Sequence, residues 1–157
     1  MPHIRVSARA IIFDNNNILL IKRVGSKFVD NGEYYVLPGG GIEPGETAHQ
    51  AIVREIREES GLTVSAGELL FVQDIQPDGT IHNPIAHMSM VFRCELTNSN
   101  KLTEPEIPDN DPEGLYSQPV WFPIQQLHTV NFLPRIAENI QNYYKNGSLE
   151  PRYFAST

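Results

Sequence analysis

The sequence predicts an α/β fold, specifically an α/β/α sandwich around a mixed β-sheet. Two observations support this prediction: apolar strand patterns lie on both sides of one amphipathic helical segment, and a second helical segment closes the chain. The chain has 157 residues, which is enough for one hydrophobic core, and no repeat or linker divides it. We therefore expect a single domain over residues 1–157, with a C-terminal tail from about residue 147.

The N-terminal part predicts a hairpin followed by a glycine-rich loop. Residues 4–13 alternate in polarity and residues 18–21 are uniformly apolar, so we expect two strands, which the Asp/Asn turn at residues 14–17 joins most simply as a hairpin. Residues 34–37 form a further short strand. A Pro-Gly-Gly-Gly segment at residues 38–41 ends it, and glycine allows the backbone of this loop to approach a ligand closely.

A central helix is predicted from Thr47 to Ser60. Thr47 and Gln50 form a T-x-x-Q capping box at its N-terminus, and Gly61 suits the left-handed conformation that follows its C-terminus. The apolar stripe of this helix consists of Ile52, Val53 and Ile56. One edge of the helix can therefore pack on a sheet.

The second half of the chain predicts three strands, an acidic loop and a closing helix. The strands span residues 69–75, 88–96 and 120–124. Residues 102–119 contain no lysine or arginine and have several prolines among their acids, which favours an irregular loop. The closing helix opens at residues 133–134, where a proline suits the first turn, and ends near Gly147. Its apolar face consists of Ile136, Ile140, Tyr143 and Tyr144.

Composition and charge argue against several functional classes. The formal net charge of −7 disfavours a broad basic surface for nucleic acid, and no apolar run approaches the roughly 20 residues of a membrane helix. Cys94 is the only cysteine, so no internal disulfide forms and a reducing cytoplasm is the expected location. Because Cys94 lies in an apolar strand pattern, we interpret it as a buried structural thiol.

The central helix carries three carboxylates on one face. Glu55, Glu58 and Glu59 fall within an arc of about 100° around the helix axis. Each like-charge pair at this spacing costs roughly 0.2–0.5 kcal/mol even when solvated. A solvated helix face is the simplest alternative, but a hard divalent cation with oxygen ligands would supply the missing positive charge. The pattern therefore predicts a metal site.

The same helix belongs to a longer motif that starts in the glycine-rich loop. Its fixed residues are Gly40, then after five residues Glu46, then after seven residues Arg54-Glu55-Ile56, and then Glu58-Glu59 and Gly61-Leu62, each after one further residue. This run resembles the signature of the Nudix hydrolases at every defining position. The order of the surrounding elements is also similar to that family, although Tyr35 stands where many members carry Trp.

The resemblance implies a hydrolase that uses Mg²⁺ or Mn²⁺ to cleave the phosphoric anhydride bond of a small nucleotide substrate. The implied cation ligands are Glu55, Glu58, Glu59 and a backbone carbonyl near Gly39. Gly39 and Gly40 would form part of the loop that holds the cofactor. Arg54 would pair with Glu46 and orient Glu55 without touching the substrate. Bridging cations neutralise developing charge on a diphosphate and lower the pKa of a bound water. The resemblance also allows a homodimer.

Two further candidate residues lie outside the motif. Glu113 precedes the last predicted strand, where family members often draw an additional metal ligand or general base. Glu104 and Glu106 compete for this role, and a solvated acidic loop is equally compatible with the pattern. Lys22 and Arg23 end the second strand; exposed strand-end charges explain this pair most simply, and a phosphate contact from Arg23 is the functional alternative.

The sequence leaves the substrate open. Pro77 stands 15 residues beyond Leu62, which is similar to a proline of ADP-ribose-hydrolysing members, but Pro77-Asp78-Gly79 also suits a hairpin turn. We slightly favour ADP-ribose or another nucleoside diphosphate derivative, with nucleoside triphosphates as the nearest alternative. A non-catalytic nucleotide sensor is disfavoured because every motif acid is present. An RNA 5′-end hydrolase is disfavoured because no basic track accompanies the site.

Overall fold

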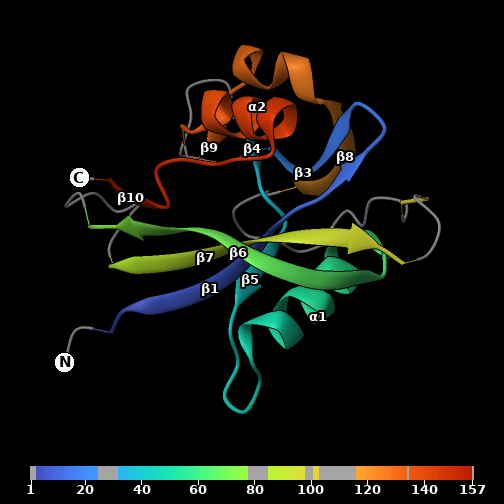
Figure 1. The fold of residues 1–157 in the computed structure, drawn as a ribbon. Coiled ribbons are helices and arrows are strands. Elements are labelled where there is room, and N and C mark those ends of the chain that lie inside the picture. Colours follow the sequence, from blue (N-terminus) through green and yellow to red (C-terminus); the bar gives the residue numbers. More distant parts are fainter. Residues whose placement is uncertain are drawn as a thin grey trace.

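The computed structural model describes residues 3–24, 32–77, 85–97, 101–102, 116–133 and 135–156. Within these ranges the chain forms two β-sheets with an α-helix on either side (Figure 1). The helices are α1 (Ala48–Ser60), the 3₁₀ helix η1 (Ile124–Thr129) and α2 (Ala137–Asn146). No helix of the described ranges is long and apolar enough to cross a membrane.

The first sheet has five strands in the order β10-β6-β7-β1-β5. Its members are β1 (Arg5–Ile11), β5 (Gly39–Gly41), β6 (Val64–Ile75), β7 (His87–Leu96) and β10 (Tyr153–Ser156). β1 lies between a parallel neighbour, β7, and an antiparallel one, β5, so the sheet is mixed, as predicted. The register of β5 places Gly39 opposite Arg9 and Gly40 opposite Ala8.

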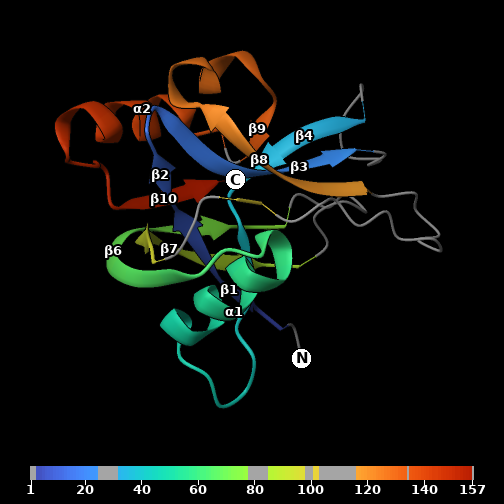
Figure 2. The ribbon, with the colours of Figure 1, turned by 90° about the vertical axis from the view of Figure 1, so that its right-hand side faces the viewer.

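The second sheet is built around β3 (Asn17–Val24). Its other members are β2 (Phe13–Asp14), β4 (Glu33–Val36), β8 (Tyr116–Pro123) and β9 (Phe132–Leu133). β2, β4 and β8 run antiparallel to β3, and β9 pairs in parallel with β4. Figure 2 shows β3, β4 and β8 stacked over the strands of the first sheet.

The first sheet separates two hydrophobic cores, because successive side chains of a strand point to opposite faces. One core packs α1 on the sheet and includes Ala8, Ala10, Ala51, Ile52 and Ile56. The other core lies between the two sheets and α2 and includes Ile11, Leu20, Phe71, Ile140 and Tyr143. Figure 1 shows α1 and α2 on opposite sides of the strands. The α/β/α sandwich is therefore confirmed, with its strands divided between two sheets.

The predicted limits of α1 are confirmed by both of its caps. The hydroxyl of Thr47 accepts a hydrogen bond from the N–H of Gln50 at 3.2 Å, and the Gln50 side chain accepts one from the N–H of Thr47 at 2.8 Å. At the other end, Gly61 takes the left-handed conformation with φ of 74° and donates its N–H to the carbonyl of Arg57 at 3.0 Å. These caps fix where the helix begins and ends.

Two predictions about the N-terminal strands are wrong in part. The strand expected at residues 4–13 is split: Arg5–Ile11 pairs with β7 and β5, and only Phe13–Asp14 forms a hairpin with β3. The glycines at Gly39–Gly41 form β5 rather than a loop, because their backbone pairs with β1. Local polarity does not reveal such pairing, since the partners are distant in sequence.

The C-terminal prediction is also corrected. The residues after Gly147 are not simply a tail, because β10 pairs in parallel with β6 and the Phe154 ring packs edge-on against Phe71 with ring centroids 5.1 Å apart. α2 begins later than expected, at Ala137, since Phe132–Leu133 pairs with β4 instead. It ends at Gly147 as predicted, with a left-handed φ of 70°.

Candidate active site

α1 presents two of its carboxylates to the glycine strand β5. The N–H of Gly39 donates a hydrogen bond to Glu59 Oε1 at 2.9 Å. Gly40 lies directly against Glu55, because a Cβ built on Gly40 would come within 2.5 Å of Glu55 Oε1. Gly39 has φ of 134°, and a Cβ there would overlap the backbone of Ala8. Glycine at both positions therefore lets β5 reach these acids.

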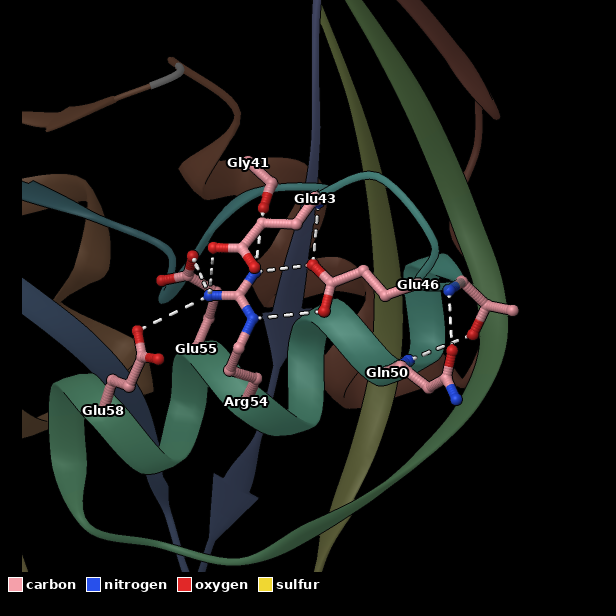
Figure 3. Close-up of polar contacts among 8 residues, drawn as sticks. Gly41, Glu43, Glu46, Gln50, Arg54, Glu55 and Glu58 are labelled. Atoms are coloured by element: carbon pink, nitrogen blue, oxygen red, sulfur yellow. Dashed lines mark hydrogen bonds and ion pairs between the residues drawn. The ribbon is translucent and has the colours of Figure 1, made fainter.

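Arg54 is the centre of an acidic cluster (Figure 3). Its Nε and Nη2 donate to the two carboxylate oxygens of Glu46 at 3.1 and 2.6 Å, which is a bidentate pair. Nη1 donates to Glu55 at 2.9 Å and to Glu58 at 3.5 Å, and Nη2 also reaches the carbonyl of Gly41 at 3.1 Å. The bonds to Glu46 and Glu55 raise the pKa of Arg54, and Arg54 lowers the pKa of Glu46. Arg54 is thus a fixed cation that restrains Glu55.

Glu59 has a different environment from Glu58, although both lie on the same helix face. The Glu58 side chain is 59% exposed, whereas burial raises the pKa of Glu59 to about 7. The Gly39 N–H and the nearby cations Arg9 and Arg23 oppose this shift. A bound divalent cation would likewise favour the ionised form of the Glu59 carboxylate.

Arg9 is a charged residue near these carboxylates that sequence reasoning missed. It lies in β1, and its Nη1 donates to the carbonyl of Leu37 at 2.7 Å. Burial, with the positive charge of Arg23 as a second cause, lowers the pKa of Arg9 to about 10, against the effect of Glu59. The only signal in the sequence is an arginine between two alanines in the middle of a strand of alternating polarity.

Arg23, for which a phosphate contact is the alternative to an exposed strand-end charge, follows Lys22 on β3. Lys22 Nζ lies 3.1 Å from Glu33 Oε2, so for Lys22 the reading as a strand-end surface charge is the better one. Arg23 differs, because its Nε is buried and has no hydrogen-bond partner in the described part of the chain.

Comparison with known proteins places these residues in a family. The pattern of the NUDIX domain matches residues 3–145, which include α1, β5 and both sheets except β10. The chain belongs to the Nudix hydrolase family. The resemblance found in residues 40–62 is therefore confirmed, and it extends over most of the chain.

Relatives of this Nudix chain carry several activities. The ADP-ribose pyrophosphatase of Methanocaldococcus jannaschii is 43% identical over 95 residues, which cover 60% of this chain and 52% of that protein. The 8-oxo-dGTP diphosphatase of Proteus vulgaris is 30% identical over 102 residues, which cover 64% of this chain and 83% of that protein. The match thus spans about half the length of the archaeal protein.

A solved structure confirms the fold. A NUDIX hydrolase from Nitrosomonas europaea superimposes with a TM-score of 0.67 at 20% identity, over 96% of this chain and 93% of that one. At this level of identity the likeness concerns the arrangement of the elements and leaves the substrate open.

The donors of the Nudix helix fit a hard divalent cation in kind, since all three are carboxylate oxygens. Among the described residues, no three His, Cys, Asp or Glu side chains converge on one point. Arg54 holds Glu55 and Glu58, and the Gly39 N–H holds Glu59. A cation would therefore compete with Arg54 for Glu55 and Glu58, and the exposed Glu58 can turn toward it at little cost.

Several predicted residues cannot be placed. Glu113, Glu104 and Glu106 lie outside the described residues, as does the turn after Pro77. Residues 116–119 of the expected acidic loop belong to β8. The role of Glu113 as a metal ligand or general base stays a prediction.

A short polar chain crosses from β1 to β7 on the face of the first sheet away from α1. Ser7 Oγ lies 2.7 Å from His87 Nε2 and donates to Ser89 Oγ at 3.1 Å. Both serines are fully buried, and burial lowers the pKa of His87 to about 4, with Arg9 and Arg5 adding to the effect. His87 is therefore neutral in the folded protein near pH 7.

Cys94 lies in β7 with its side chain fully buried and without a disulfide. Burial raises the pKa of its thiol to about 11, which keeps it protonated and unreactive. The interpretation of Cys94 as a buried structural thiol is confirmed.

Proposed function

We propose that this Nudix chain is a divalent-cation-dependent hydrolase that cleaves a phosphoric anhydride bond in a nucleoside diphosphate derivative. One observation carries the proposal: Glu55 and Glu59 of α1 lie directly against the backbone of Gly39 and Gly40. This arrangement brings hard oxygen ligands next to a backbone without side chains, where a phosphate can approach closely.

Each residue of the motif has a separate part in this proposal. Glu55, Glu58 and Glu59, with the carbonyl of Gly39, would hold the cation, for which Mg²⁺ is expected and Mn²⁺ is the alternative. A bound cation of this kind neutralises charge on a diphosphate and lowers the pKa of a coordinated water. Arg54 keeps Glu55 in position through their 2.9 Å bond. The pair of Arg54 with Glu46 fixes the guanidinium in turn.

ADP-ribose or a related nucleoside diphosphate derivative is the favoured substrate. The relative that shares 43% identity is named ADP-ribose pyrophosphatase. Pro77, just after β6, is placed like a proline of ADP-ribose-hydrolysing members. This support is weak, because a proline at this position also suits a turn. Nucleoside triphosphates are the second candidate, because other relatives are named 8-oxo-dGTP diphosphatase and nucleoside triphosphatase.

The test is hydrolysis of a substrate panel. The purified protein is incubated with Mg²⁺ or with EDTA and with ADP-ribose, nucleotide sugars, dinucleotides and nucleoside triphosphates, and the products are identified by mass spectrometry in ¹⁸O-water. Release of AMP and ribose phosphate supports the favoured substrate, and release of pyrophosphate from a triphosphate supports the alternative. A folded protein that cleaves no member of the panel with Mg²⁺ or Mn²⁺ would contradict the proposal.

Two further expectations belong to the whole protein. The resemblance allows a homodimer, and light scattering on the purified protein tests that prediction. A cytoplasmic location is supported by the single reduced Cys94, and fractionation of the source cells tests it.

A further inference from the structure

A pocket lies between η1 and α2, and α1 lies on the opposite side of the strands from α2 (Figure 1). The volume of the pocket is about 390 Å³, which is in the range of small-molecule sites. Its lining residues come from the two helices and are Ile124, Gln125, His128, Gln141, Tyr144 and Lys145. None of them belongs to the motif of residues 40–62, so this pocket is separate from the proposed cation ligands.

Hydrogen bonds hold two side chains of the pocket in place. Gln141 Nε2, on α2, donates to the carbonyl of Ile124 at 2.9 Å and to that of Gln125 at 3.0 Å. The Tyr144 hydroxyl donates to Asn16 Oδ1, in the turn between β2 and β3, at 2.9 Å. A ligand would therefore meet side chains that are already ordered, which lowers the entropic cost of binding.

The contacts of Gln141 also determine the tautomer of His128. The Gln141 amide atom that contacts two carbonyl oxygens must be its nitrogen, and His128 Nδ1 lies 3.1 Å from this atom. A ring nitrogen that faces an N–H donor accepts, so the neutral imidazole carries its proton on Nε2. Among the described residues, no side chain or backbone group accepts from Nε2 of His128. This nitrogen is a free donor.

The charges around the pocket favour an anion. Lys145 lines the pocket, and its ammonium has no hydrogen-bond or ion-pair partner among the described residues. None of the lining residues is acidic, although the chain has a net charge of −7. Residues 124–147 contain Arg135 and Lys145 against a single acid, Glu138. A carboxylate or phosphate accepts strong hydrogen bonds from an ammonium group.

The pocket also offers an apolar surface. Ile124 belongs to the core between the two sheets and α2, and Tyr144 packs against that core. The Tyr144 ring is held edge-on by Phe13, with ring centroids 4.8 Å apart. A flat apolar group can pack against a fixed aromatic ring, where it gains more than the burial of its area alone.

We propose that the pocket between η1 and α2 is a second binding site, which takes a small organic anion with a flat apolar part. Lys145 and the Nε2–H of His128 bind its carboxylate or phosphate monoester. The flat part lies against Ile124 and the Tyr144 ring. The proposal does not depend on the proposed function, because it uses no residue of the Nudix motif.

Amide chemical shifts test this site. Proton–nitrogen correlation spectra of the full chain in EDTA are recorded with increasing benzoate, phenyl phosphate or benzamide. We expect saturable shifts at the amides of η1 and of the second half of α2 with both anions. Benzamide has the shape of benzoate without its charge, so it should bind about 10-fold more weakly than benzoate. The tighter of the two anions then distinguishes a carboxylate ligand from a phosphate monoester.

A pair of matched variants tests the contact with the anion. Lys145→Gln removes the charge at an exposed position, so the fold should be retained and both anions should bind about 10-fold more weakly, with benzamide unchanged. Lys101→Gln makes the same substitution at an exposed lysine outside the pocket and should leave all three affinities unchanged.

Three results would overturn the proposal. The first is the absence of saturable shifts at η1 and α2 with either anion; shifts confined to α1 and β5 count as this result, because they place the anion at the proposed active site. The second is benzamide that binds as tightly as benzoate. The third is Lys145→Gln protein that binds both anions as well as the wild type does.

Discussion

At the scale of single residues, the three carboxylates of α1 differ in their hydrogen-bond partners and in their exposure. Glu55 is bonded to Arg54, Glu59 is bonded to the Gly39 N–H, and Glu58 is largely exposed. The three acids are equivalent in the sequence motif. They differ in the structure because burial and hydrogen bonding differ along one helix face.

Glu59→Gln tests the cation ligand that is best buried. The amide oxygen can still accept the Gly39 N–H, so the fold should be retained, while the loss of charge removes an anionic ligand. We expect the turnover rate with Mg²⁺ to fall by about 100-fold or more. Glu68→Gln, at an exposed position of β6, serves as the control. Near-normal turnover of Glu59→Gln would remove Glu59 from the ligand set.

Arg54→Lys tests the positioning of Glu55. Lysine keeps the charge but cannot bond both Glu46 oxygens and Glu55 at once, since its ammonium is a point charge. We expect turnover or Mg²⁺ affinity to fall by about 10-fold to 100-fold, with a lower unfolding midpoint. Arg57→Lys, on an exposed position of the same helix, should change neither. Equal behaviour of the two variants would contradict the role of Arg54.

His87→Gln tests the buried polar chain through pH. The folded protein lowers the pKa of His87 to about 4 from an ordinary value of 6.5, so between these pH values the unfolded chain binds more protons. The unfolding free energy of the wild type should therefore fall as pH drops from 6.5 toward 4. The stability difference between wild type and His87→Gln should narrow over that window and stay constant above pH 7. Urea unfolding of both proteins at several pH values measures this difference. A difference that stays constant from pH 7 to pH 4 would show that His87 does not cause the loss of stability.

At the scale of elements, α1 and β5 form one unit. The caps of α1 fix its ends, and the pairing of β5 with β1 fixes the glycine backbone against the helix. The proposed site needs both elements. The helix supplies the carboxylates, and the glycines of β5 leave room for a phosphate to approach the backbone.

Gly40→Ala tests this unit. The new Cβ would lie 2.5 Å from Glu55 Oε1, so the flexible carboxylate must move and turnover should fall by about 10-fold or more, with little loss of stability. Gly39→Ala would instead meet the Ala8 backbone and should lower both stability and turnover. Gly45→Ala is the control: its φ of 88° adds strain of about 1–2 kcal/mol, but nothing lies within 4 Å. Full turnover by Gly40→Ala would show that the Glu55 position is not critical.

At the scale of the whole molecule, the first sheet contains both the first and the last strand of the chain, β1 and β10. β5 lies at one edge of this sheet, beside α1, and β10 lies at the other edge. The C-terminal strand therefore supports the sheet far from the proposed site.

Truncation after Leu149 tests this arrangement. It removes the ladder between β10 and β6 and the contact of Phe154 with Phe71, so the unfolding free energy should fall by about 1–3 kcal/mol. Turnover by the folded protein should change little. Urea unfolding and steady-state kinetics measure the two effects, with Tyr153→Phe as a control that loses only the hydroxyl bond to Asp74. Unchanged stability would restore the prediction of a tail.

The sequence by itself determined α1, its caps, the carboxylate arc and the family. These features depend on residues a few positions apart, where helical periodicity and capping chemistry act directly. Only the tertiary structure decided that Gly39–Gly41 is a strand, that β1 pairs with β7 and β5, and that Arg9 lies opposite Gly39, whose N–H contacts Glu59. Pairing of strands and compensation of buried charge depend on residues far apart in the chain, and a local pattern carries no record of which distant segment will supply the partner.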